Sequence, residues 1–103
     1  MSDANIPALL EELREVDFET WNKIYVRCNF VETSYDTEFG QDFIQGCIQR
    51  AIAEKGWSYQ QILYQNPTIY EAYLIGHRET IRRANTPSAA ILAAYIEAVR
   101  ARQ

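Results

Sequence analysis

The sequence holds two cysteines and one histidine, Cys28, Cys47 and His77, whose side chains can act as nucleophiles, general bases or metal ligands. Nucleophilic catalysis needs a base within reach of the nucleophile, and a structural zinc site needs closely paired ligands such as C-x2-C. The three residues stand 19 and 30 positions apart, and none has a close partner. The spacing therefore predicts no catalytic set, no metal site and no cofactor, and we expect the protein not to be an enzyme.

A second polar group consists of the acids Asp36, Glu38 and Asp42, which surround Gly40 in the stretch YDTEFGQDF. An EF-hand calcium loop needs glycine at position 6 and glutamate at position 12. Counting from Asp36, Gly40 stands at position 5 and Cys47 at position 12, so the calcium pattern is not met. Acids are favourable in the first turn of a helix, and we interpret these as marking a helix start.

The 103 residues carry a net charge of −4 that is divided unevenly along the chain. Residues 1–54 hold eleven acids and four bases, which gives −7, and residues 55–103 hold three acids and six bases, which gives +3. A chain of this length fits one domain. We therefore predict a single helical domain over residues 1–103, with an acidic half, 1–56, and a mildly basic half, 57–103.

The sequence shows neither a secretion signal nor a membrane span. Its start, MSDANIP, lacks a basic segment and an apolar core. The longest apolar run, at 89–96, has eight residues, whereas a bilayer needs about 20. We predict a cytoplasmic protein without membrane contact, in which Cys28 and Cys47 are small buried hydrophobic residues.

Apolar residues recur with the period of a helix over most of the chain, so we predict an all-α fold, a single compact domain of about five or six helices. Pro7 fits the first turn of one helix, and Asp17 can cap the next. Gly56 suits a helix end, because glycine readily adopts the left-handed conformation found there. Asn66-Pro67 and Thr86-Pro87 have the order of two further helix starts, a capping residue and then proline. The first predicted helix spans 6–16, the second begins after 17, and the third follows a connection at 33–37 and ends near 55. Further helices are predicted at 58–65 and at 67–84, and a last one begins at 87.

Aromatic residues gather in the second half of the chain. Trp57, Tyr59, Tyr64, Tyr70 and Tyr73 fall within 17 positions. Such residues are enriched at the centres of protein interfaces, and they also fill the cores of small domains, so both interpretations stay open. On a helix over 58–65, Tyr59 and Tyr64 cannot both face inward. We therefore expect one of them to contact a partner.

Two stretches resemble the phage-repressor type of helix-turn-helix domain. GWSYQQI is similar to the GLTQEEL-like opening of that family's second helix, and NTPSAAILAAYI is similar to its xxPSxxTLxxIA closing segment. The resemblance covers less than a third of the chain. It implies a DNA-binding regulator that uses helices within about 58–84, with Arg78, Arg82 and Arg83 contacting phosphates.

The distribution of charge favours a protein partner over DNA. The predicted helix over 67–84 opens without a base, and Glu79 lies one helical turn from Arg82 and Arg83, where it would neutralise part of an arginine patch. A net charge of −4 also differs from the usual basic footprint of a DNA-binding domain. We predict a small non-enzymatic intracellular protein that acts by protein–protein interaction or self-association, as an adaptor, regulator or assembly subunit, with DNA binding as the alternative. The candidate contact residues are Trp57, Tyr59, Tyr64, Arg78, Arg82 and Arg83.

Overall fold

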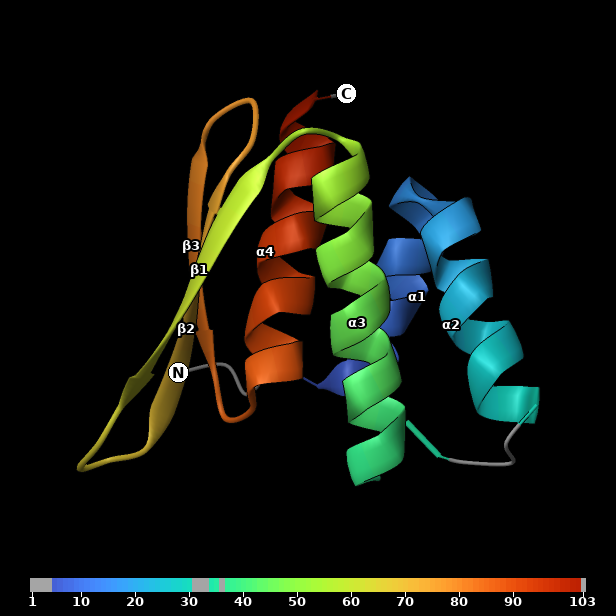
Figure 1. The fold of residues 1–103 in the computed structure, drawn as a ribbon, viewed down its shortest axis with the longest axis horizontal. Coiled ribbons are helices and arrows are strands. Elements are labelled where there is room, and N and C mark those ends of the chain that lie inside the picture. Colours follow the sequence, from blue (N-terminus) through green and yellow to red (C-terminus); the bar gives the residue numbers. More distant parts are fainter. Residues whose placement is uncertain (1–4, 31–33, 36, 103) are drawn as a thin grey trace.

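The computed structural model of the chain describes residues 5–30, 34–35 and 37–102 (Figure 1). Within these residues, four helices and three strands follow one another along the chain. They are α1 (Ile6–Val16), α2 (Phe18–Phe30), α3 (Glu38–Glu54), β1 (Ser58–Tyr64), β2 (Ile69–Ile75), β3 (Glu79–Ala84) and α4 (Pro87–Arg102). The fold is therefore α+β, and the predicted all-α fold of five or six helices is wrong.

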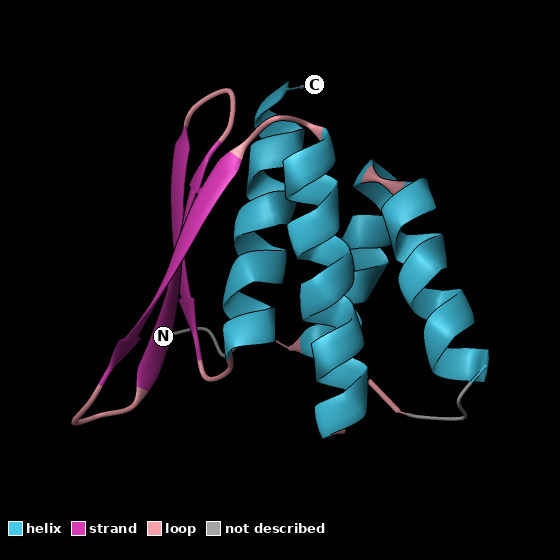
Figure 2. Ribbon diagram, in the orientation of Figure 1, coloured by secondary structure: helices cyan, strands magenta, loops and turns pink. Residues whose placement is uncertain are grey.

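The elements form three layers (Figure 1). The antiparallel sheet, with strand order β1-β2-β3, makes up one side of the molecule, and the helices lie on the other side (Figure 2). The middle layer contains α4, which packs against β2 and β3, and α3 beside it; α1 and α2 form the third layer. Among the described residues, no helix covers the outer face of the sheet.

α4 is the centre of the hydrophobic core. A helix that is apolar on all sides is buried on all sides, and α4 combines many alanines, which permit close approach, with a few large side chains. The large side chains of Leu92, Tyr95, Ile96 and Val99 are all buried. The prediction of a helix that begins at 87 is confirmed.

The predicted bounds of the first helix and the predicted start of the second are also confirmed. α1 runs over Ile6–Val16 with Pro7 in its first turn. Asp17 caps α2, because its Oδ1 accepts a hydrogen bond of 3.2 Å from the backbone N–H of Thr20. These signals depend only on neighbouring residues, which is why they can be interpreted without the tertiary structure.

The third helix also begins and ends as expected. Thr37 caps the start of α3, where its hydroxyl accepts a hydrogen bond of 3.0 Å from the N–H of Gly40. Gly56 follows the end of α3 with a φ of 74°, in the left-handed region where glycine is favoured. Of the connection predicted at 33–37, Thr33 and Asp36 lie outside the described residues.

The largest correction concerns residues 58–84, where the two predicted helices are replaced by a meander of three strands. Residues 65–68 form the turn between β1 and β2, so Asn66-Pro67 lies in a hairpin turn and not at a helix start. Asn66 has a φ of 58°, which asparagine tolerates better than most residues. β-branched and aromatic side chains favour strands, and this segment is rich in isoleucine and tyrosine.

Alternation along the strands gives the sheet two different faces. In the register, Gln61 lies opposite Ala72, and Ala72 lies opposite Arg82. Residues in these rows face α4, and Ala72 and Leu74 are fully buried there. Helical and strand patterns share the positions of Tyr70 and Leu74, so apolar spacing in this segment fits both structures.

A partly buried polar contact joins the helical layers. The hydroxyl of Tyr95 on α4 donates a hydrogen bond to Oδ2 of Asp17, between α1 and α2. The same carboxylate accepts a hydrogen bond of 2.7 Å from the hydroxyl of Thr20. Burial opposes ionisation of Asp17, but these hydrogen bonds and nearby Lys55 together lower the pKa of its carboxyl group.

Candidate protein-binding surface

α4 covers the inner face of β2 and β3 but leaves most of β1 uncovered. α4 packs against β2 and β3, whereas among the described residues β1 has a small contact with α3 and a hydrogen bond to the first residue of α4. As a result, side chains on both faces of β1 reach solvent. Tyr59 and Leu63, on the inner face, are 38% and 47% exposed, and Ile62 and Tyr64, on the outer face, are 39% and 42% exposed.

The free edge of β1 lacks the usual protection against pairing. Natural edge strands are often shortened or interrupted by bulges, or carry proline or charged side chains. β1 has the sequence SYQQILY, with seven residues, no proline and no charge, and its pairing with β2 runs without a break. Since β1 is the first strand in the order β1-β2-β3, its other edge has no neighbouring strand in the sheet.

Gln61 holds the middle of β1 against the helices. Its Nε2 donates a hydrogen bond of 3.2 Å to the carbonyl oxygen of Pro87, and its Oε1 accepts one of 3.2 Å from Nε2 of Gln49 on α3. These contacts tie the strand to α3 and to the start of α4. The backbone of β1 is therefore fixed in position although its side chains are poorly covered.

A charged cluster fixes the outer face beside the end of β1. Glu71 is 7% exposed, and its Oε2 accepts a hydrogen bond of 2.7 Å from Nε of Arg83 on β3. Its Oε1 accepts a hydrogen bond of 3.4 Å from the hydroxyl of Tyr64. The Arg83 guanidinium also lies over the Tyr64 ring, at 5.4 Å from Cζ to the centroid. The hydrogen bond with Glu71 raises the pKa of Arg83.

Apolar side chains extend over the rest of the outer sheet face. Ile75 and Ile81 are 46% and 57% exposed, and Tyr73 lies half-buried between the rows of β1 and β3. The hydrogen bond between Tyr73 and Glu79 raises the pKa of the Tyr73 hydroxyl, so this phenol stays neutral. Outside the Glu71–Arg83 pair, the centre of this face presents mainly uncharged groups.

The structure separates the predicted aromatic contact residues into two kinds. Tyr59 and Tyr64 both lie on β1, and both are exposed, because a strand with solvent on its two sides exposes odd and even positions alike. Trp57 packs against the core, with its ring centroid 6.3 Å from that of Tyr95. A Cβ at Gly76 would lie 2.8 Å from the Trp57 ring, so this tryptophan closes the junction between α3 and the sheet.

The three predicted arginines do not form one patch. Arg78 lies in the turn between β2 and β3. Arg82 and Arg83 are neighbours on β3 and point to opposite faces of the sheet, Arg82 toward Glu97 of α4 at 3.6 Å and Arg83 toward Glu71. The expected pairing of both with Glu79 assumed a helix and is wrong.

The sequence analysis missed several residues of this surface, namely Ile62, Leu63, Glu71, Ile75 and Ile81. The sequence does contain part of the pattern that predicts these strands. β1 and β2 are rich in tyrosine and isoleucine, and residues 65–68 between them carry turn-forming asparagine and proline. Glu71 could not have been found from this pattern, because its partner Arg83 becomes its neighbour only through strand pairing.

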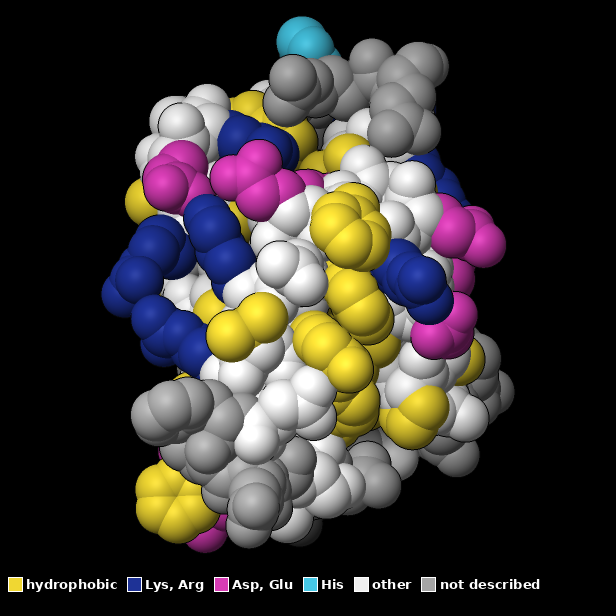
Figure 3. Space-filling view, turned by 90° about the vertical axis from the view of Figure 1, so that its right-hand side faces the viewer, with side chains coloured by type: hydrophobic (Ala, Val, Ile, Leu, Met, Phe, Trp, Pro, Cys, Tyr) yellow, Lys and Arg dark blue, Asp and Glu magenta, His cyan; other side chains and the backbone are white. Residues whose placement is uncertain are grey.

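A second apolar region lies on the helical side of the molecule. Figure 3 shows apolar side chains gathered in a stripe over that side, with basic side chains at its borders. On α2, the ring centroids of Trp21 and Tyr25 are 5.0 Å apart, and Arg14 lies over the Trp21 ring at 5.0 Å. Tyr25 is exposed. These rings contact one another and a cation within the chain. β1, by contrast, has both exposed side chains and an unpaired backbone edge, so we consider it the stronger candidate for a binding surface.

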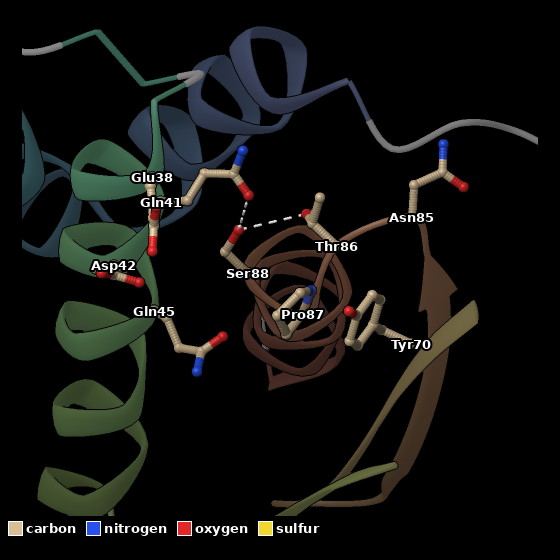
Figure 4. Close-up of a pocket in the computed structure, with 9 residues that line it drawn as sticks. All are labelled: Glu38, Gln41, Asp42, Gln45, Tyr70, Asn85, Thr86, Pro87 and Ser88. Atoms are coloured by element: carbon tan, nitrogen blue, oxygen red, sulfur yellow. Dashed lines mark hydrogen bonds between the residues drawn. The ribbon is translucent and has the colours of Figure 1, made fainter. Parts of the chain in front are cut away.

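A polar hollow of about 500 Å³ lies between α3 and the start of α4 (Figure 4). The hydroxyl of Ser88 donates a hydrogen bond of 2.9 Å to Oε1 of Gln41 across it. Pockets for small molecules are mostly apolar with a few polar groups, and this lining is mainly acids, amides and hydroxyls. We assign it no ligand.

The residues first considered for chemistry lie apart. Cys28 and Cys47 are free and buried, as predicted, and burial raises the pKa of both thiols. His77 lies exposed in the β2–β3 turn. Within the part of the chain that the structure describes, no three potential metal ligands gather at one place.

Comparisons of this chain with models of known protein families, with curated proteins and with solved structures find no match. In residues 5–30, 34–35 and 37–102, no helix has both the length and the apolar character needed to cross a bilayer. The feature of the surface that most clearly indicates a function is β1, which combines an unpaired backbone edge with exposed apolar side chains on both faces.

Proposed function

We propose that this protein is a non-enzymatic binding module, an adaptor, regulator or assembly subunit, that pairs the free edge of β1 with a strand of another polypeptide. The observation that carries the proposal is the position of β1, whose backbone edge is unpaired in the sheet while its side chains on both faces remain exposed. Adding a strand there would satisfy backbone hydrogen bonds and cover Tyr59, Ile62 and Leu63 at the same time.

The mode of binding follows from how β1 is held. In strand addition, main-chain hydrogen bonds supply affinity, and alternate side chains supply specificity. Gln61 and the Glu71–Arg83 pair keep the strand in place before a partner arrives. A preorganised strand loses less conformational entropy on binding than a mobile loop would.

The proposal includes a cytoplasmic location. It is supported by two free cysteines, Cys28 and Cys47, both buried as thiols. Disulfides are typical of oxidising compartments, so a small domain that relies on a hydrophobic core in place of cross-links suits a reducing one.

Site-specific photocrosslinking in living cells would test the binding surface. A photoreactive amino acid at Ile62 on β1 should give a discrete adduct, whereas the same group at Glu15, exposed on α1, should give none. Leu63→Lys, which adds a charge to the same strand, should remove the adduct because edge lysines oppose strand pairing. Absence of any adduct at Ile62, with normal levels of folded protein, would overturn the proposal.

DNA binding, the alternative from the sequence, has weaker support. The segment 58–84 forms strands, and Arg82 and Arg83 point to opposite sides with an acid beside each. Non-specific contacts with phosphates are strongest at low salt, so a duplex-binding assay at about 50 mM salt is the sensitive test. We expect no binding there, and a salt-dependent complex lost in Arg82→Glu/Arg83→Glu would favour DNA instead.

A further inference from the structure

We infer that the partner of β1 is the β1 strand of a second copy of this chain, paired antiparallel about a two-fold axis at Gln61. The inference rests on the proposed function and names the partner for the same surface. Two sheets joined in this way would form one sheet of six strands, with the order β3-β2-β1-β1-β2-β3. Two-fold symmetric dimers, in which the same surface of both copies meets, are the commonest oligomers of soluble proteins.

The sequence of β1 is complementary to itself in this register. With Gln61 opposite Gln61 of the second copy, all seven residues of the strand, Ser58 to Tyr64, are paired. Tyr59 then lies opposite Leu63 of the second copy, and by symmetry the same apolar contact forms twice. Cross-strand pairs of an aromatic and an aliphatic side chain stabilise antiparallel sheets. Shifting the register by two residues leaves fewer residues paired and places Tyr59 or Leu63 opposite glutamine.

Charge permits this association. β1 carries no charge, so no like charges meet across the new strand pair. The ionic groups nearest to it on the sheet are already in pairs, Arg83 with Glu71 and Arg82 with Glu97. α1 and α2, which belong to the acidic half, form the layer on the other side of α4, so their charges lie away from the new strand pair.

The same register places the helices of both copies on one side of the joined sheet. Tyr59, Gln61 and Leu63 share the inner face, and in an antiparallel pair directly opposite residues share a face. The α3 helices are the helices next to β1, so they would approach each other across the two-fold axis. α3 of the second copy would then cover the exposed inner-face side chains of Tyr59 and Leu63.

α3 exposes two small residues, Gly46 and Ala53, on the face where this approach would occur. Gly46, Gln49 and Ala53 lie at helical spacing on one face, and Gln49 is the residue bonded to Gln61 of β1. Gly46 is exposed, and a Cβ built on it would have no atom within 4 Å. Glycine in the middle of a helix is unfavourable relative to alanine, and no neighbour within the monomer requires it here. A second α3 packed against this face gives a reason for Gly46.

The contact area indicates a reversible dimer. Taking about 200 Å² for a whole tyrosine side chain, the exposed fractions of Tyr59 and Tyr64, 38% and 42%, leave about 80 Å² on each. β1 by itself therefore offers less than the roughly 800 Å² that each partner contributes to a standard interface. The α3 contact must supply much of the remainder, and the dimer population should depend on protein concentration.

Sedimentation velocity on the full chain, from about 1 μM to about 1 mM, would reveal such a dimer. Tyr59→Lys and Leu63→Glu should each weaken it about tenfold or more, because each removes the apolar pair twice. Both positions are exposed in the monomer, and circular dichroism with thermal melting would verify that each variant folds. A chain that remains monomeric over the whole range would overturn the inference.

Mixing the two variants tests the register itself. A mixed dimer of Tyr59→Lys and Leu63→Glu places the introduced lysine of one chain opposite the introduced glutamate of the other and keeps one wild-type Tyr59–Leu63 pair. We expect the mixture to dimerise more tightly than either variant alone, and the double variant Tyr59→Lys/Leu63→Glu to recover a dimer through two ion pairs. No recovery in either case would overturn pairing about Gln61.

Gly46→Gln separates the α3 contact from strand pairing. It should weaken the dimer without destabilising the monomer, because nothing lies within 4 Å of the added Cβ and glutamine is a better helix former than glycine. Asn22→Gln, at an exposed position of α2, is the matched control and should leave the dimer unchanged. Unaltered dimerisation of Gly46→Gln would overturn the α3 contact.

The photocrosslinked adduct at Ile62 distinguishes the proposed binding function of β1 from the inference that β1 pairs with a second copy of the chain. An adduct with twice the mass of the chain supports pairing between copies. An adduct with a different polypeptide, from a chain that sediments as a monomer, would overturn self-pairing and leave β1 as a binding surface. The absence of both adduct and dimer would overturn self-pairing and the proposed function together.

Discussion

The hydroxyl of Tyr95, buried in the middle of α4, donates a hydrogen bond to the carboxylate of Asp17 between α1 and α2. Residues 78 positions apart in the sequence are thereby joined at the point where the helical layers meet. Asp17 also caps α2 through Thr20, so one carboxylate fixes a local helix start and a long-range contact.

Tyr95→Phe should lower the free energy of unfolding by about 1–3 kcal/mol, because it leaves a partly buried carboxylate without one of its donors. Chemical denaturation followed by circular dichroism measures the change. Tyr73→Phe, which removes a hydroxyl from the outer sheet face, is the control and should leave stability nearly unchanged. Equal effects of the two substitutions would contradict a structural role for the Tyr95 hydroxyl.

The Asp17 contacts should also appear in the pH dependence of stability. The pKa of this carboxyl group is lower in the folded chain than its ordinary value of about 3.9. Its contribution is therefore fully present above the ordinary pKa and is lost as the pH falls through the lower pKa of the folded state. Asp17→Asn should reduce stability at neutral pH and flatten the loss of stability in acid, as measured by unfolding at a series of pH values.

Gly46 and Gly76 should respond to alanine in opposite ways. Gly76→Ala should destabilise the chain by about 1–3 kcal/mol, because the added methyl group would overlap the Trp57 ring. Gly46→Ala should stabilise the monomer by about 0.5–1 kcal/mol, because the site is open and helical. Thermal unfolding of dilute protein compares them, and a loss of stability in Gly46→Ala would argue against an open site.

The two cysteines should react slowly in the folded protein. Burial raises the pKa of both Cys28 and Cys47, so little thiolate is present, and both side chains are inaccessible. At about pH 8, labelling by a thiol-reactive disulfide should be far slower in the native chain than in urea. Rapid labelling of either cysteine in the native state would show that the helical layers open.

Removing one partner of the Glu71–Arg83 pair should cost more than the pair itself contributes. Arg83→Gln leaves the carboxylate of Glu71, 7% exposed, without its strongest donor. The double variant Glu71→Gln/Arg83→Gln should therefore be less destabilised than the two single changes together predict. A double-mutant cycle measures this coupling, and additive effects would indicate that the contact is not formed.

Much of the helical half followed from the sequence, because its signals are local. Pro7, Asp17 and Gly56 each act on residues within one turn, and the apolar stripes of α1, α3 and α4 extend over several turns. The burial of Cys28 and Cys47, predicted from the absence of a secretion signal, is confirmed. Helix caps and amphipathic periods depend only on nearby residues, so they require no knowledge of the fold.

The sheet, and with it the candidate surface, was decided by tertiary structure. The apolar residues from Tyr59 to Ile81 fit a helical period as well as a strand period, and only pairing of β2 with both neighbours selects the strand. The exposure of β1 has no local signature at all, because it depends on how far α4 extends across the sheet. The sequence indicated that these tyrosines would either fill the core or contact a partner. The extent to which α4 covers the sheet decided which of them remain exposed.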